Sequence, residues 1–204
     1  MKNIVVVRSS VNGEKSVSNQ MIDAFLAKVR AKFPDVEVLE HDLGKHAIPA
    51  LTPETVAAVR DSKTDTQVQK QADQLATSLV EELKAADAVV LGVPRYNFHV
   101  PATLKSYIDY IARPRITFKY GDNGPEGLLP HETPVYAFVS SAGYYSINPE
   151  SDFISLWLKQ VMSFVGLDNL ELIHTEGFAM GEDHAKLAFE KTQQRIDEIV
   201  GSLS

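Results

Sequence analysis

Cysteine is absent from the 204 residues of this chain. Its absence excludes disulfide bonds, thiolate metal ligands and cysteine nucleophiles. Long apolar runs are absent as well. No stretch approaches the roughly 20 residues that a membrane helix needs, and the run that begins at Asn3 is too short for the core of a signal peptide. We therefore expect a cytoplasmic protein that has no membrane partner.

Positive charge is in deficit. The chain has 20 lysines and arginines against 27 aspartates and glutamates, which gives a net charge of −7. This balance disfavours nonspecific binding to nucleic acid or to anionic membranes. The six histidines show neither H-x-x-x-H nor H-E-x-x-H spacing, so we expect no metal site.

What the sequence does have is a hydrophobic content of 44%. That content is enough for one core, and we predict a single domain over residues 1–204. Apolar runs alternate with stretches of helical periodicity, which predicts a parallel sheet in a three-layer α/β sandwich. The predicted strands are 3–8, 36–41, 87–93, 134–140 and 169–175, and the predicted helices are 17–32, 67–85, 101–112, 150–165 and 182–202.

Two connections, 42–66 and 113–133, are longer than simple links between elements. The first contains a candidate short helix at 54–60, and the second has prolines and glycines around its aromatic residues. Loops of this length in a compact domain are typical of lids or binding surfaces. Exposed aromatic residues there would otherwise favour aggregation.

The third predicted strand ends in a polar and aromatic segment. Proline cannot extend a central strand, so Pro94 ends the strand and is followed at its carboxyl end by Arg95, Tyr96, Asn97 and Phe98. Ligands bind at this edge in open α/β sheets. Aromatic rings and an amide suit a flat heteroaromatic ligand. The alternative is that the aromatic residues only cover the end of a helix.

A serine-rich turn follows the first strand. Ser10 lies in the loop, and Ser16, Val17 and Ser18 stand where the first helix begins. The free N–H groups of a helix start, together with serine hydroxyls, attract anions. The loop has one glycine, Gly13, and neither G-x-G-x-x-G nor G-x-x-x-x-G-K-[ST], which favours a terminal monophosphate over a dinucleotide. Ordinary helix capping is the alternative for this turn taken alone.

Four spaced motifs carry a resemblance that runs in order from about residue 3 to beyond residue 180. They are Ser9-Ser10 with Ser16-x-Ser18-Asn19-Gln20, Pro94-x-Tyr96-Asn97-Phe98, Thr117-Phe118-x-Tyr120 with Gly124-Pro125-x-Gly127-Leu128, and Ser140-x-x-Gly143. On these motifs the chain resembles the FMN-dependent NADH:quinone oxidoreductases and azoreductases of the bacterial type, in the flavodoxin-like superfamily. Two positions depart from the pattern. Arg95 stands where many members have methionine, and Ser141-Ala142 replaces a common Arg-Gly.

The resemblance implies a flavodoxin-like, five-stranded sheet in the order 2-1-3-4-5 and an FMN-dependent enzyme. Hydride would pass from NADH or NADPH to a quinone or azo acceptor in a ping-pong, two-electron cycle, in homodimers that share two active sites. The flavin carries the hydride, so we expect no catalytic side chain. The predicted FMN contacts are Ser10, Ser16, Val17, Ser18, Pro94, Arg95, Tyr96, Asn97, Phe98, Ser140, Ser141, Ala142 and Gly143, and the predicted substrate pocket contains Phe118, Tyr120 and Met162.

Several alternatives stay open on the sequence alone. The protein could be a flavodoxin-like electron carrier that works with a protein partner, or a binding module without flavin. Arg95 either lies at the pyrimidine edge and raises the flavin potential, or points outward into solvent or an interface. His99 is either a proton donor to the acceptor or a surface residue. Trp157 and Met162 are either core residues or partner contacts.

Overall fold

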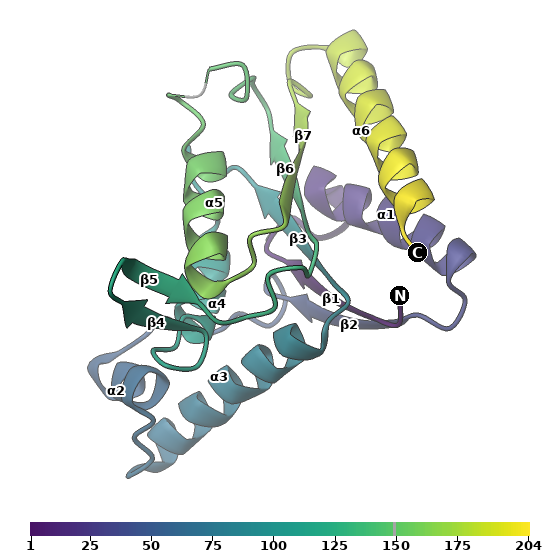
Figure 1. Cartoon of the computed structure of the whole chain (residues 1–204). Coiled ribbons are helices and arrows are strands. Elements are labelled where there is room, and N and C mark those ends of the chain that lie inside the picture. The colour runs from purple at the N-terminus through teal and green to yellow at the C-terminus, as the bar shows by residue number, and fades with distance from the viewer. Residues whose placement is uncertain (149) are drawn as a thin grey trace.

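A computed structural model describes residues 1–148 and 150–204 of the chain. Five parallel strands form one sheet in the order β2-β1-β3-β6-β7 (Figure 1). The strands are β1 (Asn3–Arg8), β2 (Glu37–Asp42), β3 (Ala88–Pro94), β6 (Val135–Ser141) and β7 (Leu170–Glu176). The predicted architecture and strand order are confirmed. The limits of β1 agree with the prediction, and each of the other strands lies one residue later than predicted.

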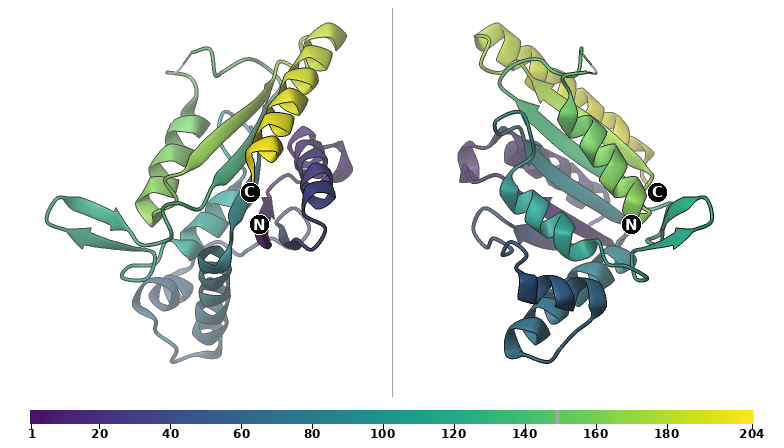
Figure 2. Two further views of the ribbon diagram at one scale, coloured as in Figure 1. Left: turned by 45° about the vertical axis from the view of Figure 1, so that its right-hand side comes forward. Right: turned by 90° about the vertical axis from the view of Figure 1, so that its left-hand side faces the viewer.

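Helices cover both faces of the sheet (Figure 2). The helices on one face are α1 (Val17–Lys32) and α6 (Glu182–Ser202), and those on the other are α3 (Gln67–Ala85), α4 (Ala102–Ile111) and α5 (Phe153–Val165). Successive strand residues point to opposite faces. Ile4 and Val6 therefore join the core with α1, while Val5 and Val7 join the core with α3 and α4. Within the described ranges, no helix combines the length and the apolar character that a bilayer crossing requires.

The ends of several elements follow local signals. β3 ends at Pro94, as predicted, opposite Ser140 of β6. α5 begins after Asp152 and not at residue 150, because the Asp152 carboxylate accepts a hydrogen bond from the N–H of Ser155 and caps the helix. The short helix predicted at 54–60 is confirmed as α2 (Pro53–Asp61).

The connection 113–133, predicted as a loop, contains an antiparallel hairpin of β4 (Phe118–Gly121) and β5 (Gly124–Gly127). Asp122 and Asn123 form its two-residue turn, and such residues are turn formers, which is the signal that the prediction missed. Gly127 lies against the carboxyl end of α5, since a Cβ there would come 2.1 Å from the Gly166 nitrogen. The hairpin is anchored at that end of α5 and projects from the sheet (Figure 2).

Candidate functional site

The carboxyl ends of β1 and β3 bring the serine turn and the aromatic segment together. Ser9 Oγ donates to the Gly92 carbonyl oxygen at 2.6 Å. Ser10 Oγ lies 3.0 Å from the phenol oxygen of Tyr96, which is 86 residues away in the chain. The N–H of Val11 donates to the same phenol oxygen at 3.2 Å. The two predicted segments therefore form one continuous edge.

The serine turn ends in a capped helix. After a short 3-10 helix, η1 (Gly13–Lys15), Ser16 caps α1: its Oγ accepts the N–H of Asn19 at 3.3 Å and lies 3.1 Å from Ser18 Oγ. Ser16 and Ser18 are buried, and Val17 between them is half-buried. The first N–H groups of a helix have no carbonyl partner within it. With the helix dipole and two hydroxyls, this helix start suits an anionic group.

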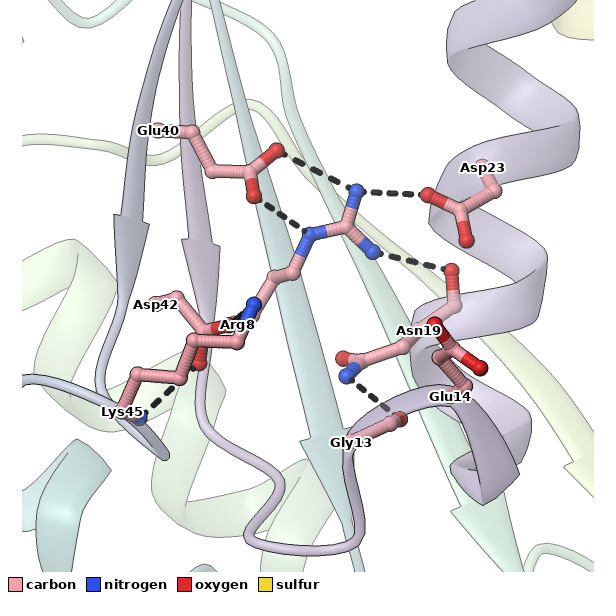
Figure 3. Close-up of a pocket in the computed structure, with 8 residues that line it drawn as sticks. All are labelled: Arg8, Gly13, Glu14, Asn19, Asp23, Glu40, Asp42 and Lys45. Atoms are coloured by element: carbon pink, nitrogen blue, oxygen red, sulfur yellow. Dashed lines mark hydrogen bonds and ion pairs between the residues drawn. The ribbon is translucent and has the colours of Figure 1, made fainter.

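Behind the serine turn lies a polar cavity of about 270 Å³ between β1, β2 and α1 (Figure 3). Arg8 crosses this cavity and pairs with Asp23 at 2.7 Å and with Glu40 at 3.1 Å. Its Nη1 also donates to the Asn19 carbonyl at 3.0 Å, so Arg8 fixes the start of α1. The Asn19 amide donates to the Gly13 carbonyl at 3.1 Å, while its buried Oδ1 has no partner in the described part of the chain. A ligand donor or a water would satisfy this oxygen.

Residues 96–99 form a tight turn with unusual backbone angles. Tyr96 and His99 exchange backbone hydrogen bonds of 2.9 and 3.0 Å, and Asn97 and Phe98 between them have φ values of 47° and 72°. Positive φ at both central positions is typical of a type I′ turn and is strained for phenylalanine. Such strain costs on the order of 1–3 kcal/mol and persists where the surroundings impose it. Asn97 and Phe98 are exposed, Phe98 by 64%, so the turn offers an amide and a ring to a ligand.

The end of β6 lies beside this turn. The Ser140 carbonyl accepts the N–H of Arg95 at 2.8 Å. Ala142 is exposed and Gly143 is half-buried. A Cβ on Gly143 would meet the ring of Tyr145 at 3.7 Å and, among the described residues, nothing nearer. The space beside Gly143 is therefore open to a ligand.

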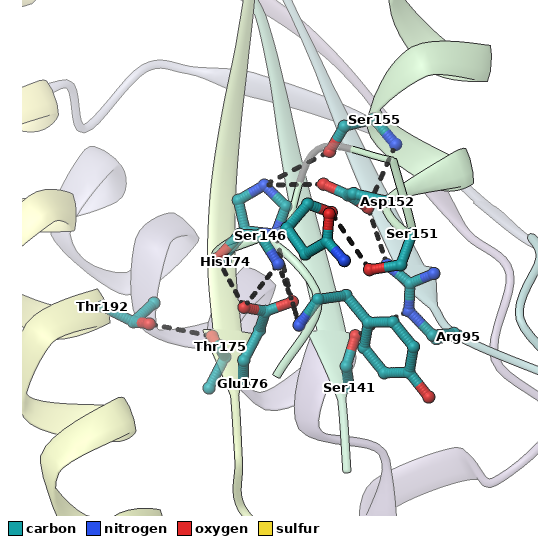
Figure 4. Close-up of polar contacts among 12 residues, drawn as sticks. Arg95, Ser141, Ser146, Ser151, Asp152, Ser155, His174, Thr175, Glu176 and Thr192 are labelled. Atoms are coloured by element: carbon teal, nitrogen blue, oxygen red, sulfur yellow. Dashed lines mark hydrogen bonds and ion pairs between the residues drawn. The ribbon is translucent and has the colours of Figure 1, made fainter. Parts of the chain in front are cut away.

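The Arg95 side chain is buried, with 3% of it exposed, so the alternative of a solvated arginine is wrong. Its Nη2 pairs with Asp152 at 2.7 Å (Figure 4). Its Nε donates to Ser141 Oγ at 3.1 Å, and its Nη1 donates to the Phe98 carbonyl at 3.3 Å. The guanidinium carbon lies 3.9 Å from the centre of the Tyr145 ring. Arg95 therefore joins the 96–99 turn to β6 and to the segment that follows it.

Asp152 is charged in this environment. Burial by itself raises the pKa of Asp152, but the hydrogen bonds from Ser155 and Arg95 and the nearby His174 outweigh burial and hold the pKa below its ordinary value. His174 lies between two carboxylates: its Nε2 is 3.9 Å from Asp152, and its Nδ1 is 3.7 Å from Glu176. Arg95 is thus part of a polar network with Asp152, His174 and Glu176, and it is not an isolated cation.

The three residues predicted for the substrate pocket lie away from the turn. Met162 is 2% exposed and packs in the core, because it lies on the face of α5 that covers the sheet. Phe118 is 6% exposed, and its ring packs tilted against the ring of Phe164 with 4.1 Å between ring centres. Tyr120, in contrast, is 77% exposed. The hairpin that carries both lies at the carboxyl end of α5 (Figure 1), where Phe118 packs on Phe164, and Asp152 caps the start of the helix. The 13 residues of α5 therefore separate the hairpin from Asp152 by about 20 Å.

Sequence reasoning missed Tyr145, Asp152 and Glu176. Asp152 had a usable signal, since it precedes the helical period of α5 as an N-cap residue. Tyr145 and Glu176 had none, because they approach the site through the pairing of β6 with β7. His99 is exposed and lies edge-on to the partly buried Trp157, with 5.6 Å between ring centres.

Comparison with known proteins identifies the fold and the family. A family model described as the flavodoxin-like fold matches residues 2–200. The chain is 38% identical over 200 residues to the FMN-dependent NADH:quinone oxidoreductase of Photorhabdus laumondii, covering 98% of this chain and 99% of the relative. It is 37% identical over 203 residues to the protein of the same name from Herminiimonas arsenicoxydans, with coverage of 98% and 99%. Among solved structures, an azoreductase from Bacillus anthracis str. Sterne matches with a TM-score of 0.87 at 27% identity, covering 100% of both chains.

Proposed function

The chain belongs to the family of FMN-dependent NADH:quinone oxidoreductases with the flavodoxin-like fold, and from this premise we propose that it oxidises NADH and reduces small quinones with FMN as its cofactor. One observation carries the proposal: the 3.0 Å contact between Ser10 and Tyr96 joins an anion site to an aromatic turn at the same sheet edge. A doubly wound sheet of this order binds FMN between its first and third strands. A cytoplasmic location and a single domain over residues 1–204 stay predictions.

The residues at this edge fit the chemistry of FMN. The start of α1 offers hydroxyls and free N–H groups to a phosphate, and the strained turn and the open space beside Gly143 offer polar and aromatic surface to a flat ring. When bound, FMN supplies the two-electron chemistry, and the protein supplies binding and orientation. The residues that we assign to FMN are Ser10, Ser16, Val17, Ser18, Pro94, Arg95, Tyr96, Asn97, Phe98, Ser140, Ser141, Ala142 and Gly143.

An anaerobic titration tests the proposal. The purified protein should show the absorption bands of oxidised flavin, NADH should bleach them, and a quinone should restore them. A colourless protein that ignores added FMN would overturn FMN dependence. A coloured protein that neither NADH nor NADPH can bleach would instead favour an electron carrier with a protein partner.

We further propose a ping-pong cycle and an additional capacity to reduce azo compounds. The exposed 96–99 turn offers the same face to the donor and to the acceptor, which favours their use in succession. The similarity to an azoreductase structure supports the azo acceptor. Initial rates measured against NADH at several acceptor concentrations should give parallel double-reciprocal lines. Intersecting lines would show a ternary complex instead.

We also propose that two subunits share each site. Tyr120 lies on the hairpin at the carboxyl end of α5, about 20 Å along that helix from Asp152. Its ring is 77% exposed, so we expect it to face a second subunit. Tyr120→Ala should change the free energy of unfolding by no more than about 0.5 kcal/mol, because the residue is exposed, yet reduce quinone turnover. Lys119→Ala, on the neighbouring exposed position of the same strand, is the control. A fully active monomer in sedimentation would contradict a shared site.

A further inference from the structure

The Arg95–Asp152 pair is buried on both sides. The exposed fractions are 3% for the arginine side chain and 7% for the aspartate side chain, and the two charged groups lie 2.7 Å apart. Within the described residues, the other buried arginines, Arg8 and Arg113, pair with carboxylates that are more exposed. A buried pair of this kind carries no net charge. Removing one partner leaves an uncompensated charge that water cannot solvate.

Arg95 also contacts the groups that face the cofactor edge. It donates to the carbonyl of Phe98, inside the strained turn, and to the hydroxyl of Ser141 at the end of β6. The Tyr145 ring lies under the guanidinium and meets the Phe98 ring edge to face, with 6.4 Å between ring centres. A planar guanidinium makes these contacts at once, whereas a lysine ammonium cannot.

Asp152 is in turn held by its surroundings (Figure 4). It accepts the N–H of Ser155 at the start of α5, and His174 lies 3.9 Å from its second oxygen. On the far side of His174, Glu176 accepts the N–H of Ser146 at 3.2 Å and the Ser146 hydroxyl at 2.6 Å. The segment after β6 is thereby fastened to β7. The carboxylate that faces Arg95 has a defined orientation before any ligand binds.

We propose that Asp152 is a positioning residue of the FMN site: it cancels the charge of Arg95 and, through Arg95, holds the Asn97–Phe98 turn and the Tyr145 ring as one wall. The inference rests on the proposed function, because it concerns the edge assigned to FMN. It replaces the alternative, left open by the sequence, in which Arg95 raises the flavin potential from the pyrimidine edge. A neutral pair contributes little net field, whereas a lone guanidinium favours negative charge nearby.

A double-mutant cycle on the FMN-loaded protein tests the cancellation, with the two-electron midpoint potential as the readout. Asp152→Asn leaves the guanidinium unopposed and should raise the potential above that of the wild type. Arg95→Met leaves the Asp152 carboxylate unopposed and should lower the potential below that of the wild type. The double variant carries neither charge and should return to the wild-type value. An unchanged potential in Asp152→Asn, or a double variant that keeps a lowered potential, would overturn the cancellation.

Arg95→Lys tests the positioning. This variant keeps the positive charge opposite Asp152 but loses the contacts to Ser141 and Phe98. Its potential should stay near the wild-type value, while its dissociation constant for FMN should rise about tenfold, the loss expected for one hydrogen bond to a charged group. FMN binding as tight as that of the wild type would overturn the positioning role.

Two further variants keep these results interpretable. Asp183→Asn changes the net charge equally at an exposed position in the first turn of α6, and it should leave the potential and FMN affinity unchanged. If Asp152→Asn does not fold, Asp152→Ser removes the charge and keeps a good helix cap. A wild type that binds no FMN would overturn the proposed function. If the wild type binds FMN and oxidises NADH but the potentials of the double-mutant cycle do not follow the expected pattern, this inference alone would be overturned.

Discussion

The two sides of the candidate site are built differently. The phosphate side, residues 9–19, is one continuous segment in which Ser16 caps α1 and the Asn19 amide reaches back to Gly13. The ring side, residues 94–99, 140–148 and 150–152, is assembled across the fold, and Arg95 and Asp152 are 57 positions apart in the chain. An anion site needs a helix start and a few hydroxyls, which short-range sequence supplies. A surface for a flat ring needs several segments held at fixed relative positions, which only packing supplies.

This contrast predicts two kinds of response to mutation. On the phosphate side, the contacts are short-range and stabilise both the helix and the ligand. Removing one of them should therefore lower FMN affinity and the free energy of unfolding together. On the ring side, a strained turn is held by long-range contacts. A substitution there should therefore be able to weaken FMN binding without lowering the free energy of unfolding.

The largest effect should come from the double substitution Ser16→Ala and Ser18→Ala. It should weaken FMN binding by about 2–4 kcal/mol, because two charge-assisted hydrogen bonds to phosphate are worth about 1.5–3 kcal/mol each before water compensates. Calorimetric titration of the apoprotein measures this loss. Riboflavin lacks the phosphate and should scarcely respond. Equal losses for FMN and riboflavin would place the phosphate elsewhere.

Ser16 is also a helix cap, so the double variant needs a matched control. Thr52 caps α2 with a similar hydroxyl, far along the chain from the serine turn. Thr52→Ala should lower the free energy of unfolding by about 1 kcal/mol, as the loss of a cap does. It should leave FMN affinity unchanged, which separates capping from ligand binding.

A smaller and opposite effect is expected from Phe98→Gly on the ring side. Glycine accepts the φ of 72° without strain, so the apoprotein should gain about 0.5–1 kcal/mol of unfolding free energy after the entropy of the added glycine is subtracted. FMN affinity should fall, because an exposed ring is lost. Arg115→Gly removes a similar strain at φ 66° and should stabilise the fold without weakening FMN. A destabilised Phe98→Gly apoprotein would show that the turn is not strained.

The smallest effect should be an acid dependence carried by Asp152. Its pKa in the fold lies below the ordinary value of 3.8, so the charged form stabilises the fold above that pH, and this stabilisation is lost as the pH falls through the folded pKa. The difference in unfolding free energy between the wild type and Asp152→Asn should therefore be constant near neutral pH and shrink below about pH 4. Chemical denaturation at a series of pH values measures it. A difference that grows in acid would contradict a lowered pKa.

Much of the fold was predictable because its signals are repetitive. The limits of α1, α3 and α6 agree with those read from helical periodicity. The hairpin at 118–127 escaped prediction, because two strands of four residues give too little alternation to recognise. Met162 was assigned to a pocket because its type and spacing suit either a core or a contact surface, and burial alone distinguishes them.

Local sequence signals were enough to predict the order of strands and helices, the place where β3 ends and the start of α1 at its serine cap. These features depend on residues a few positions apart, through periodicity, the ring of proline and side-chain capping. The packing of distant segments turns Arg95 inward to Asp152 and places Tyr120 a helix length from Asp152. Both outcomes depend on which distant segments the sheet and α5 bring together or hold apart, and no local pattern of residues encodes that choice.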